Sequence, residues 1–179
     1  MAEFLWIFWS FSLLGWVLER LFAAVTRSPR RRRRCLLLLP LCPVYGLGMA
    51  AVLALPPSLR SGWPLYLWGG LTATSVEYIY HWWGETFLSV SFWDYTGVFG
   101  NLRGRVCLPF SLAWGLLLFP AVYLVTPPVV ALADRVPVGV TWWLLLAFTA
   151  DAVCSLRFLA VTHDLEALRA VIWPVLLPV

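Results

Sequence analysis

Three ionisable side chains, Glu77, His81 and Glu85, are spaced four residues apart within an apolar stretch of the chain. On an α-helix this spacing places all three on one face. Carboxylate and imidazole groups confined together can pass protons or hold a cation, so one interpretation is a proton relay or a cation site. The alternative is structural, with Glu77 pairing with Arg20 or Arg157 to hold helices together. No further ligand set accompanies the three residues, so we predict neither a metal nor a cofactor.

Other charged side chains also lie inside apolar segments, namely Glu19 and Arg20 near the N-terminus and Asp151 and Arg157 near the C-terminus. A charge at the centre of a bilayer costs at least about 2.5 kcal/mol. Such residues therefore need either a partner of opposite charge or a water-filled cavity. The acidic side chains outnumber the basic ones inside these segments, which predicts that further arginines approach them from outside.

The segment from about residue 89 to 105 is aromatic and polar without a helical period, and it carries six candidate binding residues: Trp93, Asp94, Tyr95, Asn101, Arg103 and Arg105. Two arginines and exposed backbone at the start of a helix suit a phosphate or a lipid headgroup. In the alternative interpretation, Trp93 and Tyr95 anchor the chain at the membrane interface, Arg103 marks the cytoplasmic side, and Asp94 pairs with Arg105.

The composition indicates the setting of these residues. The chain has 179 residues, of which 61% are hydrophobic and 12% charged, and it contains 12 tryptophans; its mean hydropathy is +0.82. Soluble domains are nearer 45–50% apolar and about 25% charged. Because one span needs about 20 apolar residues, about five spans fill the chain. We predict a single all-α transmembrane domain over residues 1–179, a polytopic helix bundle.

The expected spans cover about residues 4–25, 35–55, 63–88, 106–125 and 138–161, and a short interfacial helix is expected in the C-terminal tail. The second span contains prolines and glycines that should interrupt regular helix and turn Tyr45 into the bundle; these are Pro40, Pro43, Gly46 and Gly48. The arginine run at 30–34, the arginines of the 89–105 segment and Arg169 then fall on one side. The positive-inside rule predicts an external N-terminus and a cytoplasmic C-terminus.

With this orientation most of the intramembrane charges lie toward the cytoplasm, and we expect Glu19, Glu77, Glu85, Asp94 and Arg105 to converge on one cytoplasm-facing polar cavity. No residue is assigned a catalytic role. The full candidate binding set consists of Glu19, Arg20, Tyr45, Glu77, His81, Glu85, Trp93, Asp94, Tyr95, Asn101, Arg103, Arg105 and Asp151.

Several short motifs follow one another in a fixed order along residues 8–127. The first is an SxxGWxxE pattern formed by Ser12, Gly15, Trp16 and Glu19, and the second is PLCPVYGLG at residues 40–48. The others are EY at Glu77-Tyr78, WDY at Trp93-Asp94-Tyr95, GRVCL at residues 104–108 and WG at Trp114-Gly115. This order resembles the small bacterial membrane proteins of the putative ABC-transporter type IV, or CmpB-like, family. The stretch CLLLLP replaces a glycine-containing stretch usual in that family, and the fifth span lies outside the resemblance.

The resemblance implies a transport-related subunit of the bacterial inner (plasma) membrane, possessing several spans and resembling an ABC-transporter permease. Five spans are few for a complete pathway, so a homodimer or an ATPase partner is expected besides the lipid bilayer, and no nucleic acid. Two alternatives stay open: a membrane-embedded enzyme or binder of a lipid or lipid-linked substrate, and a non-catalytic assembly protein. No Walker A, HExxH or GxSxG motif is present, which argues against a nucleotide hydrolase.

Overall fold

The computed structural model of this protein describes residues 2–26 and 35–170. These residues fold into helices without a strand, apart from one isolated bridge between Leu102 and Val106. The helices are α1 Ala2–Thr26, α2 Pro43–Leu53, η1 Pro57–Leu59, α3 Gly62–Pro64, η2 Leu65–Gly69, α4 Gly70–Trp83, η3 Gly84–Leu88, α5 Leu108–Pro120, η4 Ala121–Val125, α6 Thr126–Arg135, α7 Val138–Thr162 and α8 Leu165–Ala170.

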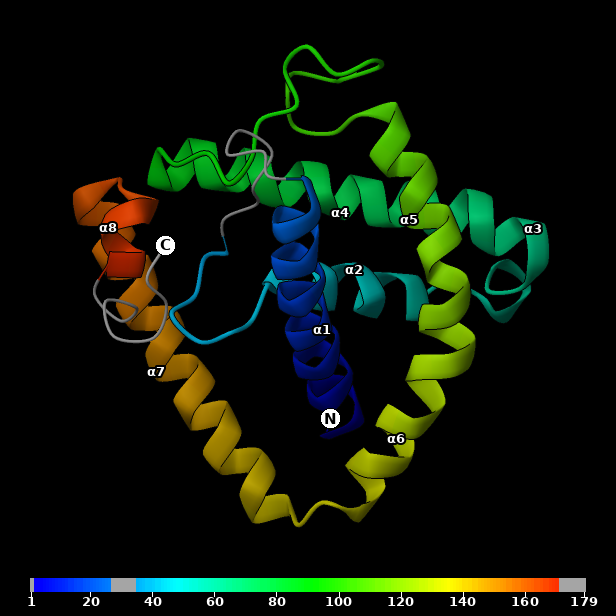
Figure 1. Ribbon diagram of the computed structural model, residues 1–179. Helices are drawn as coiled ribbons and strands as arrows, with labels where there is room; N and C mark the ends of the chain where they lie inside the picture. The colour runs from blue at the N-terminus through cyan, green and yellow to red at the C-terminus, as the bar shows by residue number, and fades with distance from the viewer. Residues whose placement is uncertain (1, 27–34, 171–179) are drawn as a thin grey trace.

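Three helical runs in the described ranges are long and apolar enough to cross a membrane: 2–25, 108–135 and 138–162. They cover all or nearly all of the predicted first, fourth and fifth spans, so the expectation of an all-helical membrane protein is confirmed. The consecutive elements α3, η2, α4 and η3 also form one helical run over residues 62–88, which matches the bounds of the predicted third span. In Figure 1, α1 lies between α5–α6 and α7, and α4 runs across the top of the view.

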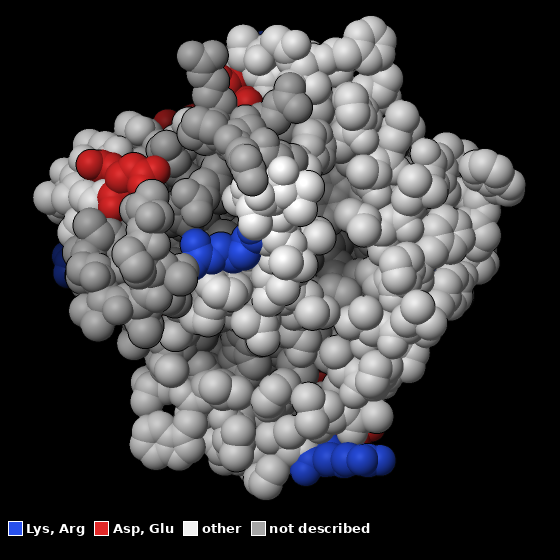
Figure 2. Space-filling model, viewed as in Figure 1, with Lys and Arg blue, Asp and Glu red and all other residues white. Residues whose placement is uncertain are grey.

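The outward surface of these helices is apolar. Large side chains such as Leu124, Trp143 and Val161 are exposed. In the face shown in Figure 2, acidic side chains lie over α8 and near the top of the view, basic ones lie at the centre and over the end of α6, and the long surface of α5 and of the first turns of α6 is uncharged. An exposed apolar surface of this extent is what a lipid-facing helix requires.

The predicted second span differs most from the structure. Residues 35–42 are not helical, and α2 begins only at Pro43 and has 11 residues. At a rise of 1.5 Å per residue α2 is about 16 Å long, whereas a span must cross about 30 Å. Gly46 and Gly48 lie within regular helix, so the expected interruption comes from the stretch before Pro43. Tyr45 is half-buried and turns toward α1, as expected.

A long-range contact explains why residues 35–42 leave the helix. The backbone N–H groups of Leu38 and Leu39 donate to the two carboxylate oxygens of Asp151 on α7, each over 3.1 Å. The hydroxyl of Ser155 also donates to this carboxylate, over 3.1 Å. Non-helical backbone at membrane depth is tolerated where protein satisfies its polar groups. Asp151 therefore anchors the segment before α2.

Replacing Asp151 with alanine should destabilise the protein. Hydrogen bonds to a charged group contribute about 1.5–3 kcal/mol each, and we expect a loss in that range because one of the two backbone donors is exposed. The thermal midpoint of the detergent-purified protein measures this loss. Asp134→Ala, an exposed carboxylate on α6, is the control and should leave the midpoint unchanged. Equal midpoints for the two variants would show that the anchor does not stabilise the fold.

The fourth span is longer than predicted. The segment 126–135, expected to be a loop, continues the helix through α6. Pro127 and Pro128 lack the backbone N–H that a helix interior would use. The π-helical turn η4 precedes them, and the hydroxyl of Thr126 donates to the carbonyl oxygen of Ala121 over 2.8 Å. The two prolines therefore join the helix without breaking it.

Glycines set two close helix crossings. A Cβ on Gly46 of α2 would lie 2.4 Å from the backbone oxygen of Phe8 on α1, and a Cβ on Gly70 of α4 would lie 3.2 Å from Cα of Gly115 on α5. Small residues at such contacts let membrane helices approach closely. These crossings bring α1, α2, α4 and α5 together around the side chains described below.

The end of α7 is tied to the end of η3. His163 adopts a left-handed backbone conformation with φ of 53°, and its Nδ1 hydrogen-bonds the carbonyl oxygen of Leu88 over 2.7 Å. The carboxylate of Asp164 accepts bonds from the N–H groups of Glu166 and Ala167 and caps α8. The tail was expected to begin as a short interfacial helix, and the structure has the six-residue helix α8 at this place. The arginine run at 30–34, the side chain of Arg169 and residues 171–179 lie outside the described residues.

Candidate functional site

Glu77 is the fully buried carboxylate at the middle of α4, with an exposed fraction of 0%. The indole Nε1 of Trp114 on α5 donates to its Oε2 over 2.7 Å. The hydroxyl of Tyr95, from the segment between η3 and α5, donates to its Oε1 over 3.2 Å. Each oxygen of Glu77 therefore accepts from an aromatic side chain of a different part of the fold, as a buried carboxylate requires.

Glu19 on α1 lies in the same network. The hydroxyl of Tyr45 on α2 donates to Oε1 of Glu19, and the Tyr45 ring lies 5.0 Å from the ring of Trp114. Gly15 makes this possible, because a Cβ there would lie 2.2 Å from the Tyr45 ring. We call Glu19, Tyr45, Glu77, Tyr95 and Trp114 the inner network. Its side-chain contacts join α1, α2, α4 and α5 to residues 89–107, which we call the connecting segment.

A second cluster lies one helical turn further along α4. Nε2 of His81 lies 3.1 Å from Oε1 of Glu85 and 3.2 Å from Oγ of Ser91. Nε of Arg105 donates to Oε2 of Glu85 over 2.7 Å, and its Nη1 donates to the hydroxyl of Tyr78 over 2.8 Å. The bond with Glu85 is the main cause that raises the pKa of Arg105, so this side chain stays cationic. We call these five residues the connector cluster.

Trp93 holds the connecting segment against the connector cluster. Its side chain is buried, its Nε1 donates to the carbonyl oxygen of Arg105 over 2.7 Å, and its ring lies 4.8 Å from that of His81. Gly84 leaves space for the neighbouring Phe92, since a Cβ there would lie 2.3 Å from that ring. The connecting segment thus folds back onto α4, as the excess of acidic groups predicted.

Asp94 belongs neither to the inner network nor to the connector cluster. Trp93 and Tyr95 are buried, while Asp94 between them is exposed. Its Oδ1 accepts the backbone N–H of Thr96 over 2.8 Å, and bonds from Thr96 lower the pKa of Asp94. This contribution to stability is present above the ordinary aspartate pKa and is lost as the pH falls through the lowered one. The alternative interpretation paired Asp94 with Arg105, whereas Arg105 bonds to Glu85.

Asn101 and Arg103 shape the loop instead of the site. The side chain of Asn101 donates to the carbonyl oxygen of Val98 over 2.9 Å and accepts the N–H of Gly104 over 3.2 Å. Arg103 is exposed with a left-handed φ of 54°, and Gly104 follows with φ of 70°. The loop geometry therefore needs an amide at position 101 and glycine at position 104.

The remaining predicted residues lie elsewhere. The guanidinium of Arg20 lies 5.2 Å from the centre of the Trp16 ring on the same helix. Asp151 accepts hydrogen bonds from the segment before α2 and belongs neither to the inner network nor to the connector cluster. The expected single set of Glu19, Glu77, Glu85, Asp94 and Arg105 is therefore divided into two adjacent groups, with Asp94 in neither.

A pocket of about 210 Å³ adjoins the inner network. Its walls come from α1, α2, α5 and the connecting segment, and they include Glu19, Phe22, Tyr45, Tyr95, Phe110 and Trp114. The predicted site residues did not include Trp114, Phe110, Tyr78 or Ser91. The signal available was a tryptophan or tyrosine inside an apolar span, because the polar atom of such a ring needs a partner when buried.

The chemistry open to this site is binding and orientation. Its walls combine aromatic rings with the carboxylate of Glu19. Within residues 2–26 and 35–170, no group of three or more His, Cys, Asp or Glu could hold a metal ion.

Comparisons with known proteins identify a family for this chain. The model of the family described as "Putative ABC-transporter type IV" matches residues 6–156. The match extends beyond the motifs of residues 8–127 and includes most of α7, which the sequence resemblance had excluded. No curated protein matches the chain. No solved structure matches it either.

Proposed function

Because the chain belongs to the family described as "Putative ABC-transporter type IV", we propose that it is a membrane-spanning subunit of an ABC-type transport system. The observation that carries the proposal is the inner network beside its pocket, where Glu19 and Glu77 are held by aromatic donors. Carboxylates inside membrane-spanning segments are energetically costly, and they mark substrate or ion pathways in membrane proteins. In this proposal the substrate enters the pocket beside Glu19.

The proposal requires a separate ATPase. The sequence contains no Walker A loop, so ATP would be hydrolysed by a partner subunit. Few spans per chain also favour two copies in the assembly. The test is purification of the tagged protein from its native membrane in mild detergent, with mass spectrometry of whatever co-elutes. We expect a protein with a Walker A loop, and its reproducible absence would contradict the proposal.

In the proposed topology the chain is one transmembrane domain that crosses the bacterial inner membrane five times. The second crossing combines residues 35–42 with α2, and the third is the helical run 62–88. The N-terminus is external and the C-terminus cytoplasmic. In Figure 1 the connecting segment lies at the top of the view and the start of α1 and the α6–α7 turn toward the bottom, which supports crossings by α1, α5–α6 and α7. The helices α2 and α4 run across this direction, so the second and third crossings are the part of the proposal that needs a direct test.

Cysteine labelling distinguishes five crossings from three. Ser58 in η1 and Phe99 in the connecting segment are both exposed, and the exposed native Cys154 would first be replaced by serine. We expect a membrane-impermeant maleimide to label Ser58→Cys in intact spheroplasts and Phe99→Cys only after lysis. Labelling of both positions only after lysis would mean that α2 and the run 62–88 do not cross the membrane.

A second candidate is an assembly protein without transport, in which the inner network only locks helices together. It is favoured by the fact that both carboxylate oxygens of Glu77 already accept aromatic donors. The two functions differ in what Glu19→Gln would change. If the network only holds helices together, Glu19→Gln should lower the thermal midpoint and leave the activity of the ATPase partner unchanged. If the network is a transport site, Glu19→Gln should change the activity of the ATPase partner and leave the thermal midpoint nearly unchanged.

A further inference from the structure

A recess lies between α5 and the chain of α3 and η2, at the right of the view in Figure 1. It has a volume of about 460 Å³ and is lined by Gly62, Trp63, Tyr66, Leu116 and Phe119. The rings of Trp63 and Tyr66 are nearly perpendicular to each other, with their centres 5.7 Å apart. A water molecule takes about 30 Å³ in the liquid. The recess therefore admits a phosphate group together with the glycerol that carries it.

The aromatic walls of this recess also carry hydrogen-bond donors. Within residues 2–26 and 35–170, neither the indole N–H of Trp63 nor the hydroxyl of Tyr66 makes a hydrogen bond. Tryptophan and tyrosine combine an apolar ring with one polar atom, and they are enriched where the headgroups of a bilayer meet its apolar core. The two side chains are thus suited to the polar part of a lipid.

Arg60 supplies positive charge at the edge of the recess. Its carbonyl oxygen accepts a hydrogen bond from the hydroxyl of Tyr123 over 3.3 Å, and the Tyr123 ring lies 6.4 Å from that of Phe119. The side-chain Nε of Arg60 is buried and has no hydrogen-bond partner in the described part of the chain. Buried polar atoms nearly always have a partner, and a phosphate beside the guanidinium would provide one.

The apolar part of a lipid would have a surface to follow on α5. Leu108, Leu112 and Leu116 are exposed and spaced four residues apart, so they share one face of the helix. This face begins in the recess at Leu116 and leads toward the start of α5. In a bilayer such a face lies against acyl chains. A soluble anion would not contact it, so the surroundings of the recess favour a phospholipid.

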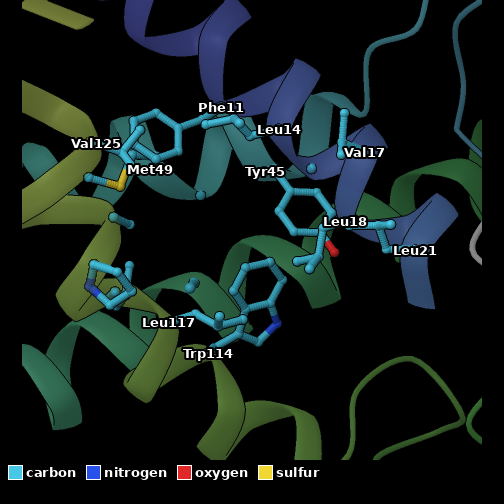
Figure 3. Close-up of a pocket in the computed structure, with 16 residues that line it drawn as sticks. Phe11, Leu14, Val17, Leu18, Leu21, Tyr45, Met49, Trp114, Leu117 and Val125 are labelled. Atoms are coloured by element: carbon cyan, nitrogen blue, oxygen red, sulfur yellow. The ribbon is translucent and has the colours of Figure 1, made fainter. Parts of the chain in front are cut away.

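A second hollow, on another face of α5, differs from the recess in its polar groups. It is a groove of about 290 Å³ between α1, α2, α5 and η4, and Figure 3 shows Phe11, Met49 and Val125 toward one end of it. No charged residue is among those that line the groove. Its apolar walls would contact an alkyl chain of any lipid, so we expect no preference for one headgroup there.

We propose that the recess binds one anionic phospholipid, with its phosphate beside Arg60, Trp63 and Tyr66 and an acyl chain along the exposed leucines of α5. The guanidinium provides the charge, and the indole and the phenol provide neutral donors. The site lies apart from the inner network, and its occupation does not depend on transport. It assigns to the outer face of α5 a lipid-binding role besides that of facing the bilayer.

The test is native mass spectrometry of the full chain, purified in mild detergent and mixed with phosphatidylglycerol or with phosphatidylcholine that has the same acyl chains. We expect the first phosphatidylglycerol to bind about fivefold more tightly, because an arginine favours a headgroup of net negative charge. Arg60→Gln should weaken this binding about tenfold, since hydrogen bonds to a charged group are lost. Arg135→Gln, which replaces an exposed arginine at the end of α6, should bind as the wild type does.

Trp63→Leu gives a second measurement that remains available if Arg60→Gln does not fold. The Trp63 side chain is 75% exposed, so its replacement should leave the fold intact, and loss of the indole N–H should weaken phosphatidylglycerol binding several-fold. Trp143 on α7 is 73% exposed, and Trp143→Leu is the matched control that should leave binding unchanged.

Three results would overturn the proposal. One is equal binding of the two lipids, and another is wild-type binding of phosphatidylglycerol in both Arg60→Gln and Trp63→Leu. The third is binding of glycerol phosphate as tight as that of the lipid, because the recess would then be a site for a soluble anion. None of these results affects the co-purification test of the transport function.

Discussion

Replacing Glu77 with leucine is expected to give the largest loss of stability of any acidic side chain in the protein. The substitution removes the acceptor of two donors, the Trp114 indole and the Tyr95 hydroxyl. A buried donor left without a partner costs about 1–3 kcal/mol, so the expected loss of unfolding free energy is about 2–6 kcal/mol. The thermal midpoint of the purified protein and the fraction that elutes as a single species measure the effect.

Glu77→Gln is the matched variant, because glutamine keeps one oxygen that can accept from Trp114 or Tyr95. It should lose less stability than Glu77→Leu. If Glu77→Leu were as stable as the wild type, the two aromatic donors would not depend on this carboxylate, and the inner network would not hold α4 to α5.

The second large effect is expected at Gly46. A Cβ added there would lie 2.4 Å from the backbone oxygen of Phe8 and 2.4 Å from the hydroxyl oxygen of Ser12. Backbone cannot move aside as a flexible side chain can, so Gly46→Ala should force α1 and α2 apart. Overpacking of this kind typically costs about 1–3 kcal/mol and can cost more where backbone must shift. The thermal midpoint should fall, and the Tyr45–Glu19 contact should weaken with it.

Gly48 provides the control within the same helix, since a Cβ there would meet nothing within 4 Å. Gly48→Ala should be neutral or slightly stabilising, because alanine favours helix over glycine by about 1 kcal/mol. A similar decrease in the midpoint for both variants would mean that the α1–α2 crossing is not as close as the structure has it.

Much of the fold could be predicted from hydropathy and length. The helices at 2–26, 62–88 and 138–162 begin and end within a few residues of the predicted spans. Two segments were predicted wrongly: residues 35–42 are not helical, and residues 126–135 are helical. The apolar sequence CLLLLP favours helix, but its backbone N–H groups donate to Asp151, which lies more than a hundred residues away in the chain. The prolines at 127 and 128 suggested a break, which the turn η4 avoids.

The part of the site that lies on one helix could be predicted from residue spacing. Glu77, His81 and Glu85 share a face of the α4–η3 run, as the four-residue spacing predicts, and each bonds to residues of the connecting segment or α5. The spacing could not show that these contacts form two groups. It also could not place Asp94, because outside a helix neighbouring side chains turn to opposite sides, and here the two aromatic neighbours are the buried ones.

ATP hydrolysis by the complex that co-purifies with this protein tests most directly whether the inner network serves transport. The measurement compares the complex of the wild-type chain with those of Glu19→Gln and Asp134→Asn, reconstituted in the same lipid. We predict that an ATPase is present, that Glu19→Gln changes its turnover several-fold with little change in thermal midpoint, and that Asp134→Asn leaves turnover unchanged. An ATPase whose turnover is identical in all three complexes, or no associated ATPase at all, would contradict it.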